Sequence, residues 1–111
     1  MSEQKPMGSA MPELDEEGFL IDTKKWTEEV AQILAQEEQP RGLTEDHLIV
    51  IDYMRQYYLE FGSVPPIRML ARRTGLSLLR IKELFPNGLT KGACRYAGIP
   101  RIAIRPQFLY P

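Results

Sequence analysis

Two stretches in the first half of the chain repeat apolar residues at three- and four-residue steps, as amphipathic helices do. The first repeat predicts a helix over about 24–36, with a side-chain cap from Asp22 or Thr23. The second predicts a helix that starts after Thr44 and reaches about Glu60. The residues predicted to form the two inner faces are Trp26, Val30, Ile33 and Leu34 in the first helix and Leu48, Ile51, Met54, Tyr58 and Phe61 in the second.

A tighter pattern occupies residues 66–85, PIRMLARRTGLSLLRIKELF. Gly75 follows Ala71 at four residues and Ile81 follows it at ten, which is the spacing of a helix-turn-helix. The small alanine lets two helices approach, and the glycine allows a positive φ in the tight turn. We therefore predict an all-α protein, a small orthogonal helical bundle that contains a helix-turn-helix.

The two ends of the chain lack helical periodicity. Residues 1–13 are small and polar and are predicted to form a disordered tail. The apolar run 18–21 predicts a minor extended or strand-like segment. The chain is accordingly divided into this tail, a helical domain over 14–88 and a C-terminal arm over 89–111.

Charge is divided unevenly between the two halves of the chain. Residues 1–46 contain four Lys or Arg and twelve Asp or Glu, a net charge of −8, whereas residues 47–111 contain ten and three, a net charge of +7. Such asymmetry is typical of a surface for an anionic partner, but it also occurs where an acidic half folds over a basic half. We give these two interpretations similar weight.

The basic residues of the helix-turn-helix suggest one such partner. In a DNA-binding protein, Arg80 and Lys82 on the second helix would face a groove, and Arg72 and Arg73 would bind phosphates. The alternative is that three helices meeting at an angle simply form a small core. Because the second helix offers few side chains suited to base edges, DNA binding is our second hypothesis.

Composition excludes several classes of protein. A chain with 43% apolar and 26% charged residues is ordinary for a globular protein, and no apolar run approaches the roughly 18 residues of a membrane span. The first residues do not form a secretory signal, so we expect a cytoplasmic protein. A single Cys and a single His exclude a Cys/His zinc site, and His47 is expected to be structural or solvated. With no phosphate loop or dinucleotide motif, we expect no cofactor and no independent enzyme.

The single cysteine, Cys94, lies in LFPNGLTKGACRYAGIP at residues 84–100. Lys91 and Arg95 flank it, and either could lower the pKa of the thiol and favour the reactive thiolate. They could also contact a partner protein, which the neighbouring glycines would allow to approach closely. The alternative is that the sulfur packs as a small apolar group.

This segment resembles the end of the DsrC/TusE/DsvC family of small sulfur-carrier proteins. Upstream, LDEEGFLIDTKKW, LTEDHL and GSVPPIRML also resemble segments of that family, so that the resemblance covers roughly residues 14–100. It implies a helical domain with a mobile C-terminal arm that carries sulfur between partners of the sulfite reductase or tRNA-thiolation type. Cys94 matches the family's upstream cysteine, which makes it the candidate catalytic residue and the only possible sulfur or redox site.

The resemblance also implies a variant. The family's carrier thiol is penultimate, and continuing the pattern places that position at Arg105. An internal disulfide and transfer from a penultimate cysteine are therefore impossible here, and the protein is at most a sulfurtransferase-type carrier component or a regulator that has lost the chemistry. The last residues are apolar, so we predict that they fold back on the domain or dock on a partner; they include Ile102, Ile104, Phe108, Leu109 and Tyr110.

Overall fold

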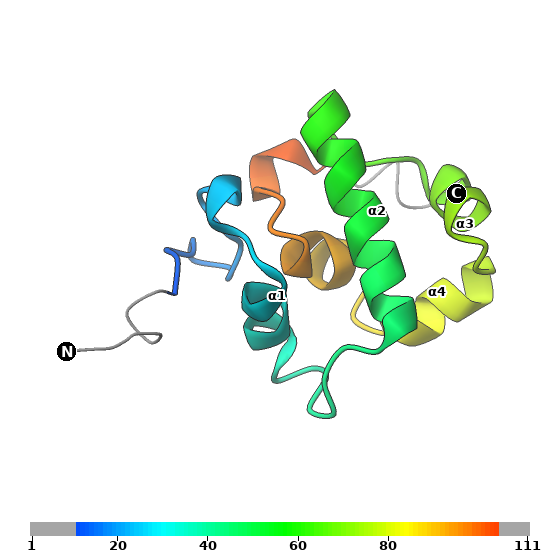
Figure 1. Cartoon of the computed structure of the whole chain (residues 1–111), viewed down its shortest axis with the longest axis horizontal. Helices are drawn as coiled ribbons and strands as arrows, with labels where there is room; N and C mark the ends of the chain where they lie inside the picture. Colours follow the sequence, from blue (N-terminus) through cyan, green and yellow to red (C-terminus); the bar gives the residue numbers. More distant parts are fainter. Residues whose placement is uncertain (1–10, 105–111) are drawn as a thin grey trace.

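The computed structural model describes residues 11–104, which form an all-α domain (Figure 1). Strand pairing within these residues is limited to one antiparallel bridge between Leu14 and Leu20, where an extended segment was predicted. No helix between residues 11 and 104 is long and apolar enough to cross a membrane. The predicted fold class is confirmed, and the elements in order are η3 (Thr23–Lys25), α1 (Glu28–Ala35), α2 (Glu45–Phe61), α3 (Ile67–Thr74), α4 (Leu78–Leu84), η4 (Thr90–Cys94) and η5 (Arg101–Ala103).

Helix α2 forms the centre of the domain. It contacts α3 and α4 on one side and the helical turn η4 on another (Figure 1). Its residues Val50, Ile51 and Met54 are fully buried. The predicted start after Thr44 is confirmed, and the helix ends at Gly62 in the left-handed conformation, with φ of 77°. Phe61, predicted to lie on the inner face, is instead 60% exposed because it occupies the last turn.

The first predicted helix is wrong in its start and its cap. Asp22 caps only the short 3-10 turn η3, and α1 begins later, where Thr27 accepts a 3.1 Å hydrogen bond from a backbone N–H. Trp26 lies between η3 and α1, where its indole N–H donates to the carbonyl oxygen of Tyr96 at 2.7 Å. This long-range contact overrides the local helical periodicity. Ile33, also predicted to face inward, is 38% exposed.

Helices α3 and α4 form the predicted helix-turn-helix. Gly75 between them has a φ of 77°, and the hydroxyl of Ser77 caps α4 by accepting from a backbone N–H. Leu70 and Ile81 are buried where the two helices meet. Local spacing therefore predicted this motif correctly.

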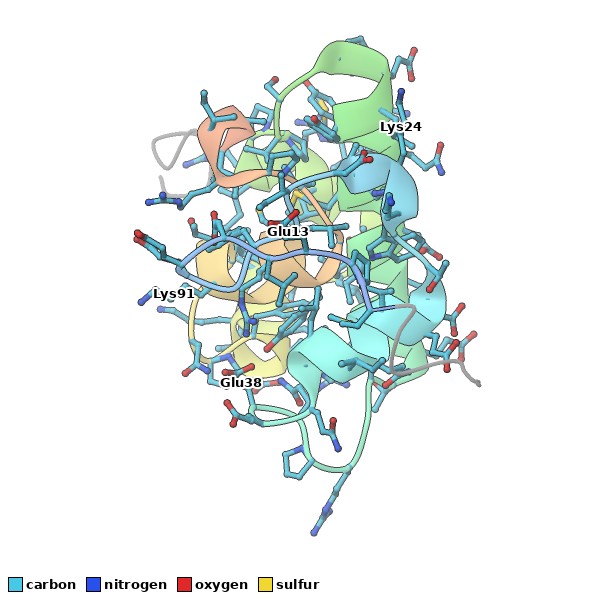
Figure 2. All side chains as sticks on the ribbon, turned by 90° about the vertical axis from the view of Figure 1, so that its left-hand side faces the viewer. Glu13, Lys24, Glu38 and Lys91 are labelled. Atoms are coloured by element: carbon cyan, nitrogen blue, oxygen red, sulfur yellow. The ribbon has the colours of Figure 1, made fainter. Side chains whose placement is uncertain are left out.

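The predicted C-terminal arm does not begin at residue 89. Leu89, Tyr96 and Ile99 are buried with the rest of the core, so that this segment is an integral part of the domain. At the other end, Met11 packs against the core, although residues 11–13 were assigned to a disordered tail. In the view of Figure 2, the segment that carries Glu13 passes in front of the turn η4, near Lys91.

Of the apolar residues predicted to fold back, Ile104 is buried, whereas Ile102 is 93% exposed, so the prediction is wrong for Ile102. Residues 1–10 and 105–111, and with them the predicted docking of Phe108, Leu109 and Tyr110, lie outside the described residues.

Candidate functional site

Cys94 ends a π-helical turn, η4. Its backbone N–H donates to the carbonyl oxygen of Leu89, five residues earlier, at 2.9 Å. The turn lies close to Phe85, because a Cβ atom placed on Gly92 would come within 3.0 Å of the Phe85 ring. π-Helical turns are uncommon in proteins, but those that occur are often found at functional sites. Gly92, two residues before Cys94, allows this turn to pack closely against Phe85.

A tight turn at Gly98 follows Cys94 by four residues. This residue has a φ of 74°, a conformation that side chains with a Cβ atom rarely adopt. A Cβ atom there would also lie 2.6 Å from Cδ1 of Trp26 and 3.0 Å from Leu20. The AGIP segment that follows Cys94 and Tyr96 is thus shaped by its packing beneath the tryptophan.

The thiol of Cys94 is fully buried. Burial raises the pKa of Cys94 from its ordinary value of 9.0 to about 12, because the thiolate would lose its hydration. Our prediction that Lys91 and Arg95 lower this pKa is therefore wrong: desolvation dominates. In this conformation the sulfur packs as a small apolar group.

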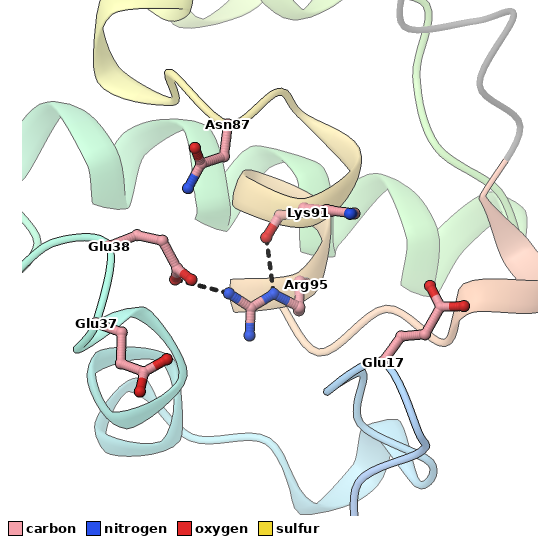
Figure 3. Close-up of a pocket in the computed structure, with 6 residues that line it drawn as sticks. All are labelled: Glu17, Glu37, Glu38, Asn87, Lys91 and Arg95. Atoms are coloured by element: carbon pink, nitrogen blue, oxygen red, sulfur yellow. Dashed lines mark hydrogen bonds and ion pairs between the residues drawn. The ribbon is translucent and has the colours of Figure 1, made fainter.

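Arg95 interacts with neighbours other than the thiol. Its guanidinium donates to Glu38 Oε1 at 2.7 Å and to the carbonyl oxygen of Lys91 at 2.8 Å (Figure 3). The hydroxyl of Tyr96 donates to the same Glu38 oxygen at 3.1 Å. Burial, together with this bond to Glu38, raises the pKa of Tyr96 to about 12. Arg95 consequently links Glu38, three residues after the end of α1, to the turn that carries Cys94.

The outer side of the same turn borders a polar hollow of about 770 Å³. Lys91 is exposed there, and its side chain extends away from Glu38 (Figure 3). The structure therefore brings Lys91 and Arg95 together on the outer side of the turn whose inner side holds Cys94. The hollow is lined by Glu17, Glu37, Glu38, Asn87, Lys91 and Arg95.

The four basic residues considered for DNA lie elsewhere, on α3 and α4. Arg72, Arg73 and Lys82 are exposed. Arg80 forms ion pairs with Asp46 at 3.0 Å and with Glu83 at 3.6 Å, so part of its charge is neutralised within the domain. None of the four lines the hollow beside Lys91 and Arg95. The structure thus separates the predicted residues into two regions.

Sequence reasoning missed two side chains that hold the Cys94 region in place, Glu38 and Arg55. Arg55 donates to the hydroxyl of Thr23 at 2.8 Å and to the carbonyl oxygen of Ala97 at 3.0 Å, and its guanidinium lies 4.6 Å from the centre of the Trp26 ring. Each of these contacts joins residues far apart in the chain. No local spacing could have indicated them.

His47 has the structural role that we expected. Its Nδ1 accepts from the backbone N–H of Thr44 at 3.0 Å, and its Nε2 donates to the carbonyl oxygen of Leu84 at 2.9 Å. Burial lowers the pKa of His47, which favours this neutral form. Among residues 11–104, no group of three His, Cys, Asp or Glu side chains is arranged to hold a metal ion.

Comparison with known proteins supplies the family. The model of the family "DsrC like protein" matches residues 7–103. The dissimilatory-type sulfite reductase subunit gamma of Nitratidesulfovibrio vulgaris is 38% identical over 89 residues, which cover 80% of this chain and 85% of that protein. Sulfurtransferase TusE of Pectobacterium atrosepticum is 36% identical over 94 residues, which cover 78% of this chain and 85% of that protein.

Solved structures agree with these relatives. The oxidised gamma subunit of dissimilatory sulfite reductase, DsrC, from Archaeoglobus fulgidus superposes with a TM-score of 0.71 at 43% identity, covering 81% of this chain and 88% of that one. The solution structure of the DsrC/gamma subunit from Pyrobaculum aerophilum gives a TM-score of 0.70 at 43% identity, with 79% and 80% covered. The chain therefore belongs to the DsrC/TusE family of sulfur-metabolism proteins, which its sequence segments resembled.

Proposed function

We propose that this protein acts in the cytoplasm as an interaction partner in sulfur relay, docking with proteins of the sulfite reductase or tRNA-thiolation type. The observation that carries the proposal is the arrangement of the Cys94 turn in a chain of this family. The outer side of the turn exposes Lys91 beside Arg95, which is largely covered and paired with Glu38, and its inner side holds the single thiol. A docked partner is thus well placed to affect access to Cys94.

Sulfur loading at Cys94 would follow opening of this turn. The thiolate would attack the outer sulfur of a persulfide, R–S–SH, forming Cys94–S–SH and releasing R–S⁻ as the leaving group. The electrons balance without an added oxidant. Burial raises the pKa of Cys94 to about 12, so the closed conformation disfavours the thiolate that this step needs. Partner binding would have to expose the thiol first.

Mass spectrometry of the intact protein tests this proposal. The full chain is incubated with glutathione persulfide alone, in urea, and with purified sulfite reductase-type or thiolation proteins of the same organism. We expect one added sulfur atom to appear slowly on the isolated protein, and faster in urea or with a partner. A Cys94→Ser variant should gain none.

Two results would contradict the proposal. If the adduct forms in urea but no partner of either type accelerates it, the relay role is lost. If Lys91→Glu weakens co-purification with those partners no more than the exposed control Lys24→Glu does, the outer side of the turn is not the docking surface.

DNA binding is a second candidate, supported by the helix-turn-helix and by the exposure of Arg72, Arg73 and Lys82. Binding in a gel shift should weaken as salt rises, because phosphate contacts release counterions. Replacing the three residues with alanine should abolish the shift if the motif binds DNA. A shift that survives this change would remove the candidate.

A further inference from the structure

An apolar groove runs along the outer face of the helix-turn-helix. It is a hollow of about 370 Å³ that begins at α3 and continues over α4 to the loop beyond it. Leu79 and Leu78 on its wall are 67% and 43% exposed. Lys82 is the single charged residue among those that line it, and the others are Ile67, Leu78, Leu79, Ile81, Phe85, Pro86, Gly88 and Leu89. A groove of this composition is suited to apolar side chains.

We propose that the last residues of this same chain occupy the groove, with Phe108, Leu109 and Tyr110 as the side chains that enter it. Three neighbouring large apolar residues are costly to leave in water. In the segment 105–111 the one charged side chain is that of Arg105, three residues before Phe108. The apolar triplet can therefore enter the groove without burying a charge.

The length of the chain beyond Ile104 allows this contact. Ile104 belongs to the hydrophobic core of the domain, as do Ile81, Phe85 and Leu89, which line the groove. An extended chain spans at most about 3.3–3.6 Å per residue, so that Tyr110 can lie roughly 20 Å from Ile104. The molecule measures 48 × 29 × 22 Å, so this length is comparable with its two shorter dimensions.

The composition of the segment lowers the cost of ordering it. Pro106 fixes one of its own backbone dihedrals and restricts Arg105 before it, so less conformational freedom is lost at these two positions when the segment becomes ordered. The docked triplet would cover Leu78 and Lys82 on α4. A partner or nucleic acid that uses this face must then displace the segment, which lowers its apparent affinity.

Methyl NMR of the full chain at low concentration tests the inference. We expect nuclear Overhauser effects between the rings of Phe108 or Tyr110 and the methyl groups of Leu78 or Leu79. Changing Phe108, Leu109 and Tyr110 together to serine should shift those methyl signals, whereas the control Gln107→Ser should not.

A second variant gives an independent measurement. Leu79→Glu should release the segment, so that the amides of residues 107–110 exchange with solvent at least about tenfold faster. The matched control is Leu59→Glu, because Leu59 on α2 is 52% exposed and does not line the groove. This control should leave the exchange unchanged.

Three results would overturn the inference. The first is exchange of residues 107–110 that is already unprotected in the unmodified protein. The second is methyl shifts at Ile21 and Ile102, which line a different hollow, in place of Leu78 and Leu79. The third is protection that grows with protein concentration, which would assign the groove to a second copy of the chain. None of these results depends on sulfur transfer, so the proposed function is tested separately.

Discussion

The turn that carries Cys94 and the hairpin of α3 and α4 are built in opposite ways. In the first, glycines allow close packing, the thiol is fully buried, and Arg95 is paired with Glu38. In the second, two leucines and several cations face outward. The segment that is most specific to the family is therefore closed, and the segment that is common to many folds is open. Family-specific residues can be maintained for packing as well as for chemistry.

The largest difference between the two regions is expected when one glycine in each is changed to alanine. Gly98 and Gly75 have φ values of 74° and 77°, but a Cβ atom at Gly98 would meet Trp26 at 2.6 Å, whereas nothing lies within 4 Å of one at Gly75. Gly98→Ala should lower the free energy of unfolding by roughly 3–4 kcal/mol, since overpacking adds to backbone strain. Gly75→Ala should cost about 1–2 kcal/mol from strain alone.

Urea denaturation measures both variants. Equal losses would show that the Gly98 region relaxes at no cost and is not tightly packed.

Removing Arg55 tests how the closed region is held. Arg55→Met keeps most of the aliphatic volume but removes hydrogen bonds to the hydroxyl and carbonyl of Thr23 and to the carbonyl of Ala97. We expect a loss of about 2–3 kcal/mol in the free energy of unfolding, together with faster alkylation of Cys94. Thermal denaturation and iodoacetamide labelling provide the measurements. Unchanged alkylation would show that the contacts of Arg55 with Thr23 and Ala97 do not limit opening of the turn.

The buried thiol also predicts a dependence on pH. The pKa of Cys94 is raised from 9.0 to about 12, so above pH 9 the unfolded chain loses this proton while the native state keeps it. Stability should therefore fall by about 1.4 kcal/mol per pH unit between pH 9 and pH 12. Comparison with Cys94→Ala separates the contribution of the thiol to this pH dependence from that of Tyr96, whose pKa is also raised. Parallel pH profiles for the two proteins would mean that the thiol is hydrated.

The smallest effect is expected in the open region. Arg80 and Asp46 form an ion pair at 3.0 Å, but the two side chains are 45% and 35% exposed, so solvent screens the pair. Arg80→Ala should change the free energy of unfolding by no more than about 0.5 kcal/mol, and less at high salt. Chemical denaturation at two salt concentrations would show this. A loss above 1 kcal/mol would place the hairpin among the tightly held parts of the domain.

Local patterns predicted the elements whose contacts are local. Thr44 caps the start of α2 and Gly62 caps its end. Gly75 and Ser77 form the turn of the helix-turn-helix. These positions could be predicted because caps and turns depend on neighbouring residues. The start of α1 was wrong because Trp26 bonds to Tyr96, 70 residues away. Periodicity contains no information about such a partner.

The same limit explains the error at the candidate site. Lys91 and Arg95 are close to Cys94 in sequence, yet burial decides the pKa of the thiol and Arg95 turns to Glu38, 57 residues away. The family segments directed attention to this region of the chain. Its electrostatics depended on packing that one sequence does not contain.

The single tryptophan of the protein has a practical consequence. Trp26 donates its indole N–H to Tyr96, two residues after Cys94, and lies beneath the guanidinium of Arg55. Its fluorescence therefore depends on the packing of the segment that directly follows Cys94. A shift of its emission to longer wavelength would report opening of the turn in real time, without any label, and would reveal whether a given partner opens it.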